Sequence, residues 1–190
     1  MLDELIEYDR ELFLYLNNLG NPTWDPFWLL MTDKWTAIPL YAVLLFLIYK
    51  KIGVKGTLIT MVLVALMITC TDQLANLFKH GFERPRPCGQ EGVKEATRFI
   101  AERCGRFGYF SAHASNSTAL AVFVGLILKK FYPKLIYFLL FWALIVTYSR
   151  IYVGVHYPLD VITGMLIGTL LGLLFVVLHK FFFQKFKIVF

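Results

Sequence analysis

The stretch Pro158–Leu178, PLDVITGMLIGTLLGLLFVVL, determines which class of fold the chain can adopt. Its only charged side chain is that of Asp160, and it has the roughly 20 apolar residues that a helix needs to cross a bilayer. Because backbone polar groups cannot stay unpaired in lipid, the stretch predicts a transmembrane helix. The whole 190-residue chain is 58% hydrophobic and 17% charged, with a mean hydropathy of +0.62. Soluble domains average about 45–50% apolar residues, so the composition excludes a soluble or disordered protein.

Four other apolar stretches are long enough, or nearly so, to cross the bilayer as helices. They are Trp35–Tyr49, Gly56–Phe78, Ser115–Leu128 and Leu135–Tyr148. The sequence therefore predicts an all-α fold, a polytopic membrane helical bundle that forms one domain over residues 1–190. We expect five transmembrane helices, with a sixth only if Leu12–Met31 also crosses.

Residues 1–20 are predicted to form an amphipathic, interfacial helix on the membrane surface. Apolar residues recur there at helical spacing with charged residues between them, as in helices that lie in the plane of a membrane. The apolar set is Leu2, Leu5, Ile6, Leu12, Phe13, Leu16 and Leu19. Polar residues, a glycine and a proline at positions 17–22 then end the helix.

The basic residues fall into two groups that differ in their acidic neighbours. Nine of the 19 are lysines at connections between apolar stretches, with no acidic residue near them: Lys50, Lys51, Lys55, Lys129, Lys130, Lys134, Lys180, Lys185 and Lys187. The other ten share the rest of the chain with all 13 acidic residues. By the positive-inside rule, the lysine-rich loops and the C-terminus are predicted to face the cytoplasm across the cytoplasmic (inner) membrane. The long loop 80–114 is then predicted to face outward, toward the periplasm, and the lysines to anchor the chain rather than bind nucleic acid.

Two of the three cysteines, Cys88 and Cys104, lie in the outward loop, whereas Cys70 lies within an apolar stretch. In an oxidising compartment the two loop cysteines could form a disulfide. In a reducing compartment they would remain free thiols.

Ionisable residues gather at the outward ends of the predicted helices. They are Lys79, His113, Arg150, His156 and Asp160, which close or open four of the apolar stretches. Charged groups at membrane depth are costly and mark functional sites by default. Asp72, which precedes Lys79 by seven residues on the same helix face, could support that lysine or make a hydrogen bond between helices.

The segment Ser149–Asp160, SRIYVGVHYPLD, places a histidine and a carboxylate at the start of the last helix. Pro158 suits the first helical turn, which puts Asp160 on the same side as His156. A carboxylate there can hold the Nδ1–H of the imidazole and leave Nε2 as a nucleophile. The alternative is a pair that only caps the helix.

Three cations, Lys79, Arg86 and Arg150, are predicted to form a pocket for phosphate, because guanidinium and ammonium groups match phosphate oxygens. The alternative is pairing with acidic residues or lipid headgroups, and on that ground Arg84, Arg98, Arg103 and Arg106 are given no role. At the start of the Ser115–Leu128 helix, Ser111 and nearby backbone N–H groups such as that of Ala112 can bind a phosphate oxygen. His113 can then protonate a leaving alkoxide.

In this order, the three motifs resemble the type 2 phosphatidic acid phosphatase superfamily, which also includes bacterial acid phosphatases and vanadium haloperoxidases. The family pattern is K-x6-RP, PSGH and SR-x5-H-x3-D. The chain has Lys79-x6-Arg86-Pro87, Ser111-Ala112-His113 and Ser149-Arg150-x5-His156-x3-Asp160. Phe110 stands where the family has proline and Ala112 where it has glycine.

The resemblance implies an integral-membrane lipid phosphatase with a phosphohistidine intermediate on His156, oriented by Asp160. It implies that Lys79, Arg86 and Arg150 bind the phosphate, that His113 acts as acid and then base, and that no metal or other cofactor takes part. Undecaprenyl pyrophosphate is the preferred substrate, with phosphatidylglycerophosphate, phosphatidic acid and lipid A as alternatives. A transporter or flippase-like protein on the same fold is the non-enzymatic alternative, although nearly all the ionisable residues lie at one interface.

Overall fold

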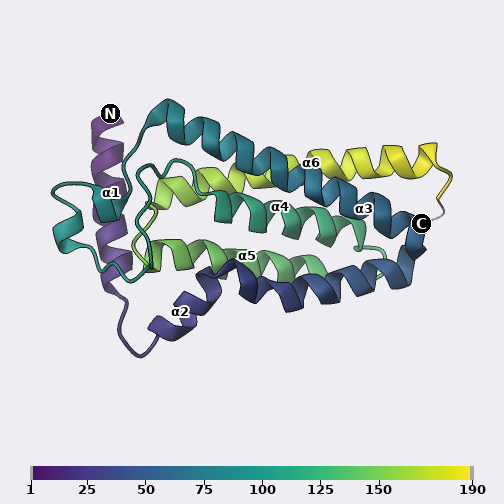
Figure 1. Ribbon diagram of the computed structural model, residues 1–190, viewed down its shortest axis with the longest axis horizontal. Helices are drawn as coiled ribbons and strands as arrows, with labels where there is room; N and C mark the ends of the chain where they lie inside the picture. Colours follow the sequence, from purple (N-terminus) through teal and green to yellow (C-terminus); the bar gives the residue numbers. More distant parts are fainter. Residues whose placement is uncertain (1, 189–190) are drawn as a thin grey trace.

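The longest helical segment, α3 (Ile38–Phe82), reverses direction at Gly53 in the computed structural model, which describes residues 2–188. Gly53 has φ 67° and ψ −177°, a backbone conformation that glycine adopts without steric cost. Figure 1 shows the two halves of α3 running in opposite directions along the long axis of the molecule. The single segment therefore supplies the two separate spans predicted over Trp35–Tyr49 and Gly56–Phe78.

Three more helices complete the bundle: α4 (Ala112–Ile127), α5 (Leu135–Tyr152) and α6 (Pro158–Lys185). The lengths and apolar character of α3, α5 and α6 are sufficient to cross a membrane, whereas α4 is shorter. Most side chains of α4 are buried, because it packs against α3, α5 and α6 in the centre of the bundle. With α3 folded into a hairpin, the described residues form a bundle of five helical arms, which correspond to the five apolar stretches of the sequence.

Helices α4 and α6 pack backbone to backbone along a row of glycines on α6. A Cβ atom on Gly164 would lie 2.6 Å from the Ser111 carbonyl oxygen, and one on Gly172 would lie 2.9 Å from that of Ala119. A Cβ on Gly168 would overlap the Ser115 carbonyl group. Small residues allow this close approach of helices in membranes. The contact places the beginnings of α4 and α6 side by side at one end of the bundle.

The N-terminal helix α1 (Leu2–Asn18) lies across that end of the bundle (Figure 1). Its buried residues Asp9, Phe13 and Asn17 follow one another at intervals of four and face the protein. Phe13 packs edge-on against Tyr157, with ring centroids 5.3 Å apart. The predicted amphipathic helix is therefore present, but one of its faces packs on the bundle. Large apolar side chains elsewhere on α1, such as Leu5 and Tyr15, are exposed.

A short helix, α2 (Asp25–Thr32), and a 3-10 turn, η1 (Lys34–Ala37), connect α1 to α3. The stretch Leu12–Met31 is thus divided between the end of α1, a turn and α2. It does not form the sixth span that was considered from the sequence.

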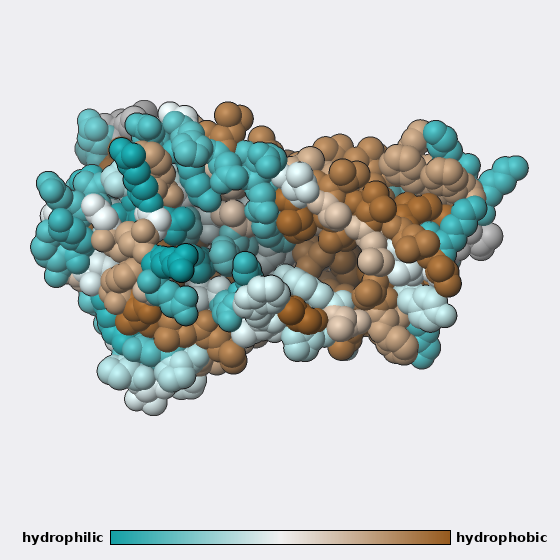
Figure 2. Space-filling view, in the orientation of Figure 1, coloured by the Kyte–Doolittle hydropathy of each residue, from teal (hydrophilic) through white to brown (hydrophobic). Residues whose placement is uncertain are grey.

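The outward loop between α3 and α4 contains two 3-10 turns, η2 (Pro87–Gly89) and η3 (Lys94–Ala96), and a disulfide between Cys88 and Cys104. Figure 2 shows apolar side chains over the body of the bundle and polar side chains at both ends. The connections that carry the nine lysines lie at the end opposite α1 and this loop (Figure 1).

Candidate active site

Five separate elements bring the predicted catalytic residues to one end of the bundle. Lys79 lies near the end of α3, Arg86 in the outward loop, His113 in the first turn of α4, Arg150 near the end of α5 and His156 in the turn before α6. The His156 imidazole is 2% exposed. Burial, together with the charges of Arg86, Arg150 and Lys79, holds its pKa well below the usual value. The same three cations also interact electrostatically with His113, so the structure gathers all five groups.

His156 and Asp160 form a buried pair at the start of α6. The Nδ1 atom of His156 lies 3.4 Å from Oδ2 of Asp160, and that oxygen also accepts a 3.0 Å hydrogen bond from the Tyr157 N–H. The backbone of Gly108 hydrogen-bonds to the imidazole as well. With Nδ1 facing the Asp160 carboxylate, the proton of a neutral imidazole is held there and Nε2 keeps its lone pair. Asp160 therefore both caps α6 and orients His156, which combines the two readings of the sequence.

Gly108 lies where a larger residue would disturb this pair. A Cβ atom there would lie 3.2 Å from Oδ2 of Asp160 and 3.1 Å from Cγ of Arg86. Its N–H donates to the Arg84 carbonyl oxygen at 2.9 Å, which fixes one arm of the loop to the other. The sequence analysis missed Gly108, because a single glycine in a loop carries no signal of its own.

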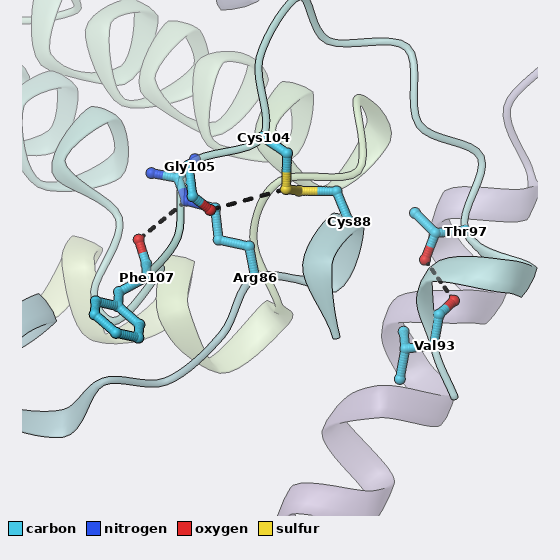
Figure 3. The surroundings of a disulfide bond; sticks show 7 residues. All are labelled: Arg86, Cys88, Val93, Thr97, Cys104, Gly105 and Phe107. Atoms are coloured by element: carbon cyan, nitrogen blue, oxygen red, sulfur yellow. Dashed lines mark hydrogen bonds between the residues drawn. A yellow bond between two sulfur atoms is a disulfide. The ribbon is translucent and has the colours of Figure 1, made fainter. Parts of the chain in front are cut away.

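Arg86 is held by the arm of the outward loop that follows the disulfide. Its Nε donates to the Phe107 carbonyl oxygen at 3.0 Å. Figure 3 shows its side chain lying against Gly105, with the Cys88–Cys104 disulfide close by. Burial lowers the pKa of Arg86, and Asp160 partly offsets that effect. The disulfide thus joins the two segments that orient this cation.

Arg150 carries an unused hydrogen-bond donor. Its Nη1 donates to the hydroxyl group of Thr32 at the end of α2. Its Nε is buried and has no hydrogen-bond partner among residues 2–188. Since buried donors are nearly always paired, this N–H is suited to a ligand oxygen.

Ser111 caps α4 rather than projecting into open space. Its Oγ accepts a 3.4 Å hydrogen bond from the Ala114 N–H, and its own N–H donates to the Asp160 carbonyl oxygen at 3.0 Å. The side chain is fully buried. These contacts tie the start of α4 to the start of α6, and they leave the Ser111 O–H group as a hydrogen-bond donor.

A cavity of about 500 Å³ adjoins His113 and Ala112. Its walls come from η1, the first half of α3, α4 and α5, and Asp72 and Asn116 contribute polar atoms. The Nδ2 of Asn116 donates to Oδ1 of Asp72 at 2.9 Å, which is the interhelical hydrogen bond considered from the sequence. Asp72 also interacts electrostatically with Lys79.

A second, more apolar cleft of about 410 Å³ lies next to this cavity. Tyr41 and Asn116 border both spaces. The cleft lies between the two halves of α3 and α4, and its other walls are mainly aliphatic, including Leu44, Ile68 and Leu120. The two spaces are therefore neighbours, one beside His113 and the other in the apolar body of the bundle.

Arg84, to which the sequence analysis gave no role, is bound directly to the His156–Asp160 pair. It donates to Oδ1 of Asp160 at 2.7 Å and to Oδ2 of Asp9 at 2.5 Å. The sequence Arg84-Pro85-Arg86-Pro87 contains two Arg-Pro pairs, and only Arg86 has the six-residue gap from Lys79 that the family pattern requires. Asp9 was missed because, in sequence, it is one acidic residue among several on an amphipathic helix.

Comparison with known proteins places the chain in a family. The family model described as the PAP2 superfamily matches residues 56–184. The lipid A 4'-phosphatase of Bacteroides thetaiotaomicron is 36% identical over 184 residues, which cover 95% of this chain and 81% of that protein. The lipid A 4'-phosphatase of Porphyromonas gingivalis is 34% identical, with 90% and 72% covered. The undecaprenyl-diphosphatase of Sulfolobus acidocaldarius is 30% identical, with 90% and 79% covered.

Two crystal structures share the fold. That of Aquifex aeolicus LpxE superimposes with a TM-score of 0.67 and 25% identity, covering 87% of this chain and 93% of that one. A transmembrane PAP2-type phosphatidylglycerolphosphate phosphatase from Bacillus subtilis superimposes with a TM-score of 0.72 over 96% of this chain and 87% of that one. At 20% identity, the second likeness concerns the fold alone.

Proposed function

The chain belongs to the PAP2 superfamily and is a membrane phosphatase, and on that premise we propose that it removes the 4'-phosphate of a lipid A-type glycolipid. The two relatives at 36% and 34% identity are lipid A 4'-phosphatases. Undecaprenyl pyrophosphate, preferred from the sequence, becomes the second candidate, supported by the relative at 30% identity. The observation that carries the chemistry is the group of three cations around a buried, uncharged His156.

The geometry suits a double displacement at phosphorus. In the first step, Nε2 of His156 attacks the phosphorus atom and the bond to the lipid oxygen breaks. Lys79, Arg86 and Arg150 stabilise the negative charge on the phosphoryl oxygens, as cations do in other phosphoryl transfers. His113, protonated once the bound phosphate offsets the surrounding positive charge, gives that proton to the departing oxygen.

In the second step, water attacks the phosphohistidine. His113, now neutral, takes a proton from the water as its oxygen bonds to phosphorus. The bond between phosphorus and Nε2 breaks, and inorganic phosphate leaves. Asp160 holds the Nδ1–H of His156 through both steps, so the ring returns to its starting tautomer.

We propose that the substrate reaches this site laterally from the bilayer. The cavity beside His113 has room for the polar headgroup near the phosphate, and the apolar cleft beyond Tyr41 and Asn116 suits acyl chains. The phosphate then lies at the cation group and the lipid chains stay among apolar walls. This arrangement supports a lipid phosphate over a small soluble ester.

A panel of lipid phosphates, each assayed with the full-length protein in detergent for release of inorganic phosphate, tests the substrate. We expect lipid A to be hydrolysed fastest, and mass spectrometry of the product to show loss of the 4'-phosphate. Faster hydrolysis of undecaprenyl pyrophosphate would support the second candidate instead. A second set of assays contains EDTA at roughly 5 mM, which exceeds the concentration of any bound divalent metal. We expect the same rate of phosphate release as without EDTA, because the proposed mechanism uses no metal.

A further inference from the structure

We propose that Asp9 and Arg84 are positioning residues, through which the N-terminal helix holds Asp160 and hence His156 in the reactive geometry. The inference rests on the proposed function, because it assumes that His156 is the nucleophile. Neither residue is expected to touch the substrate. Both act through the Asp160 carboxylate, which is fully buried.

The two oxygens of Asp160 have different partners. Oδ1 accepts from Arg84 at 2.7 Å, whereas Oδ2 accepts from the Tyr157 N–H and faces Nδ1 of His156. The Arg84 contact therefore fixes the rotation of the carboxylate and keeps Oδ2 toward the imidazole. It also supplies the positive charge that a buried carboxylate needs in order to stay ionised.

Arg84 is itself held in place by α1. Its Nη2 donates to Oδ2 of Asp9 at 2.5 Å, and its guanidinium carbon lies 4.4 Å from the centroid of the Tyr157 ring. The Asp9 side chain is 1% exposed and that of Arg84 is 19% exposed. One guanidinium group thus bridges two buried carboxylates, a geometry that its planar fork of donors allows and a lysine ammonium does not.

Asp9 also holds the start of α6. Its Oδ1 accepts from the Leu159 N–H at 2.8 Å, one of the N–H groups that a helix leaves unpaired in its first turn. A negative charge there is favourable because of the helix dipole. Asp9 therefore holds Arg84, which contacts Asp160, and it also holds the first turn of α6, which contains Asp160.

Two further contacts keep α1 in register with this turn. Phe13, one helical turn after Asp9, packs on Tyr157. Asn17, one turn later, donates to the carbonyl oxygens of Ile151 and Tyr152 at the end of α5 and accepts from the Arg98 N–H of the outward loop. One face of α1 thus contacts both helix ends and the loop that form the site.

The test compares Asp9→Asn with Glu11→Gln, a control that removes one negative charge from an exposed position on the same helix. Asparagine can still accept from the Leu159 N–H but no longer pairs as an ion with Arg84. We expect kcat of Asp9→Asn, per folded protein in the monodisperse gel-filtration peak, to fall about 10- to 100-fold, the usual size of effects transmitted through an orienting partner. KM and the affinity for vanadate, used as a phosphate mimic, should stay within about twofold, because the cations are untouched. Glu11→Gln should match the wild type.

Arg84→Lys provides a second readout that keeps the charge and loses the fork. We expect the same fall in kcat at an unchanged KM. This variant tests the inference even if Asp9→Asn yields no folded protein. Wild-type kcat in either folded variant, or a loss that appears only as a higher KM, would overturn the inference. His156→Ala separates this inference from the proposed function. If His156→Ala remained active, the proposed function would fail. If His156→Ala were inactive while Asp9→Asn and Arg84→Lys kept full activity, only the positioning role would be refuted.

Discussion

At the scale of single residues, the site keeps His156, the proposed nucleophile, uncharged because the imidazole is buried and surrounded by positive charge. Burial disfavours the imidazolium form of His156, and the cations Arg86, Arg150 and Lys79 disfavour it further. The same cations attract a phosphate. In the proposed mechanism, one arrangement of cations therefore both binds the phosphate and preserves the lone pair of His156 that attacks it.

This low pKa makes the stability of the protein depend on pH in a defined direction. Below about pH 6.5 the unfolded chain binds a proton at His156 that the folded protein does not bind. The stabilisation that is present above pH 6.5 is therefore lost as the pH falls, by up to about 1.4 kcal/mol per pH unit. Thermal unfolding in detergent should show the wild type losing stability relative to His156→Gln between pH 7.5 and pH 5.5. A stability difference that stays constant over this range would contradict the assignment.

Gly108 offers a second test at this scale. In Gly108→Ala, the new methyl group would press on Asp160 and Arg86 at 3.2 and 3.1 Å. Because small displacements of reacting groups can cost about 100-fold in rate, we expect kcat to fall by 10- to 100-fold. Gly81→Ala is the matched control, since a Cβ there meets no atom within 4 Å. Equal activity of the two variants would show that the backbone near Gly108 can move away freely.

At the scale of secondary-structure elements, the contact between α4 and α6 sets the distance between the two histidines that are proposed to be catalytic, His113 and His156. His113 lies in the first turn of α4, and His156 directly precedes α6. Because the glycines on α6 have no side chains, the backbone of α6 can lie directly against the backbone of α4. The spacing of the site therefore depends on residues far along the helix from the chemistry.

Substitution of Gly168 tests this dependence. An alanine methyl group there would overlap the Ser115 carbonyl group, so the helices must separate. Forced overpacking of this kind typically costs about 1–3 kcal/mol. We expect Gly168→Ala to unfold at a lower temperature and to hydrolyse lipid phosphate more slowly, whereas Gly81→Ala should resemble the wild type. An unchanged unfolding temperature would argue against the close contact.

These elements, and the candidate site residues at their ends, could be identified from the sequence because their signals are local. The spans follow from apolar runs, and Lys79, His113, Arg150 and His156 follow from motifs at the ends of those runs. The role of α1 could not be predicted in the same way. An amphipathic pattern shows that one face is apolar, but it does not tell whether lipid or protein covers that face.

The ion pairs of Arg84 were also beyond the reach of the sequence. Asp9 and Asp160 lie 75 and 76 residues from Arg84 along the chain. Nothing in their spacing indicates that they meet, because the meeting depends on how α1 crosses the end of the bundle. The family spacing selected Arg86 for the predicted phosphate pocket, and it left the neighbouring Arg84 without a role.

At the scale of the whole molecule, the two polar ends differ in chemistry. One end carries α1, the outward loop and the catalytic residues, and the other carries the lysine-rich connections (Figure 1). The apolar surface between them is the part that the bilayer covers (Figure 2). The positive-inside rule predicts that the end with the candidate site faces away from the cytoplasm.

Labelling of single cysteines tests this orientation. In a Cys70→Ala background, a membrane-impermeant maleimide should modify Glu11→Cys on α1 in intact cells whose outer membrane has been permeabilised. Lys134→Cys, at the opposite end, should react only after the inner membrane is broken. Both positions are exposed, so burial does not limit either reaction. The reverse pattern would place the catalytic end in the cytoplasm.

The central claim is that phosphate passes through a covalent bond to His156. Full-length protein mixed rapidly with lipid phosphate, quenched in alkali to preserve phosphohistidine and digested, should yield a peptide with one phosphate on His156. The His156→Gln variant should yield no such peptide, because it lacks the Nε2 atom that forms the bond to phosphorus. A phosphate found on another residue, or hydrolysis with inversion of configuration at a chiral phosphorus, would contradict the account.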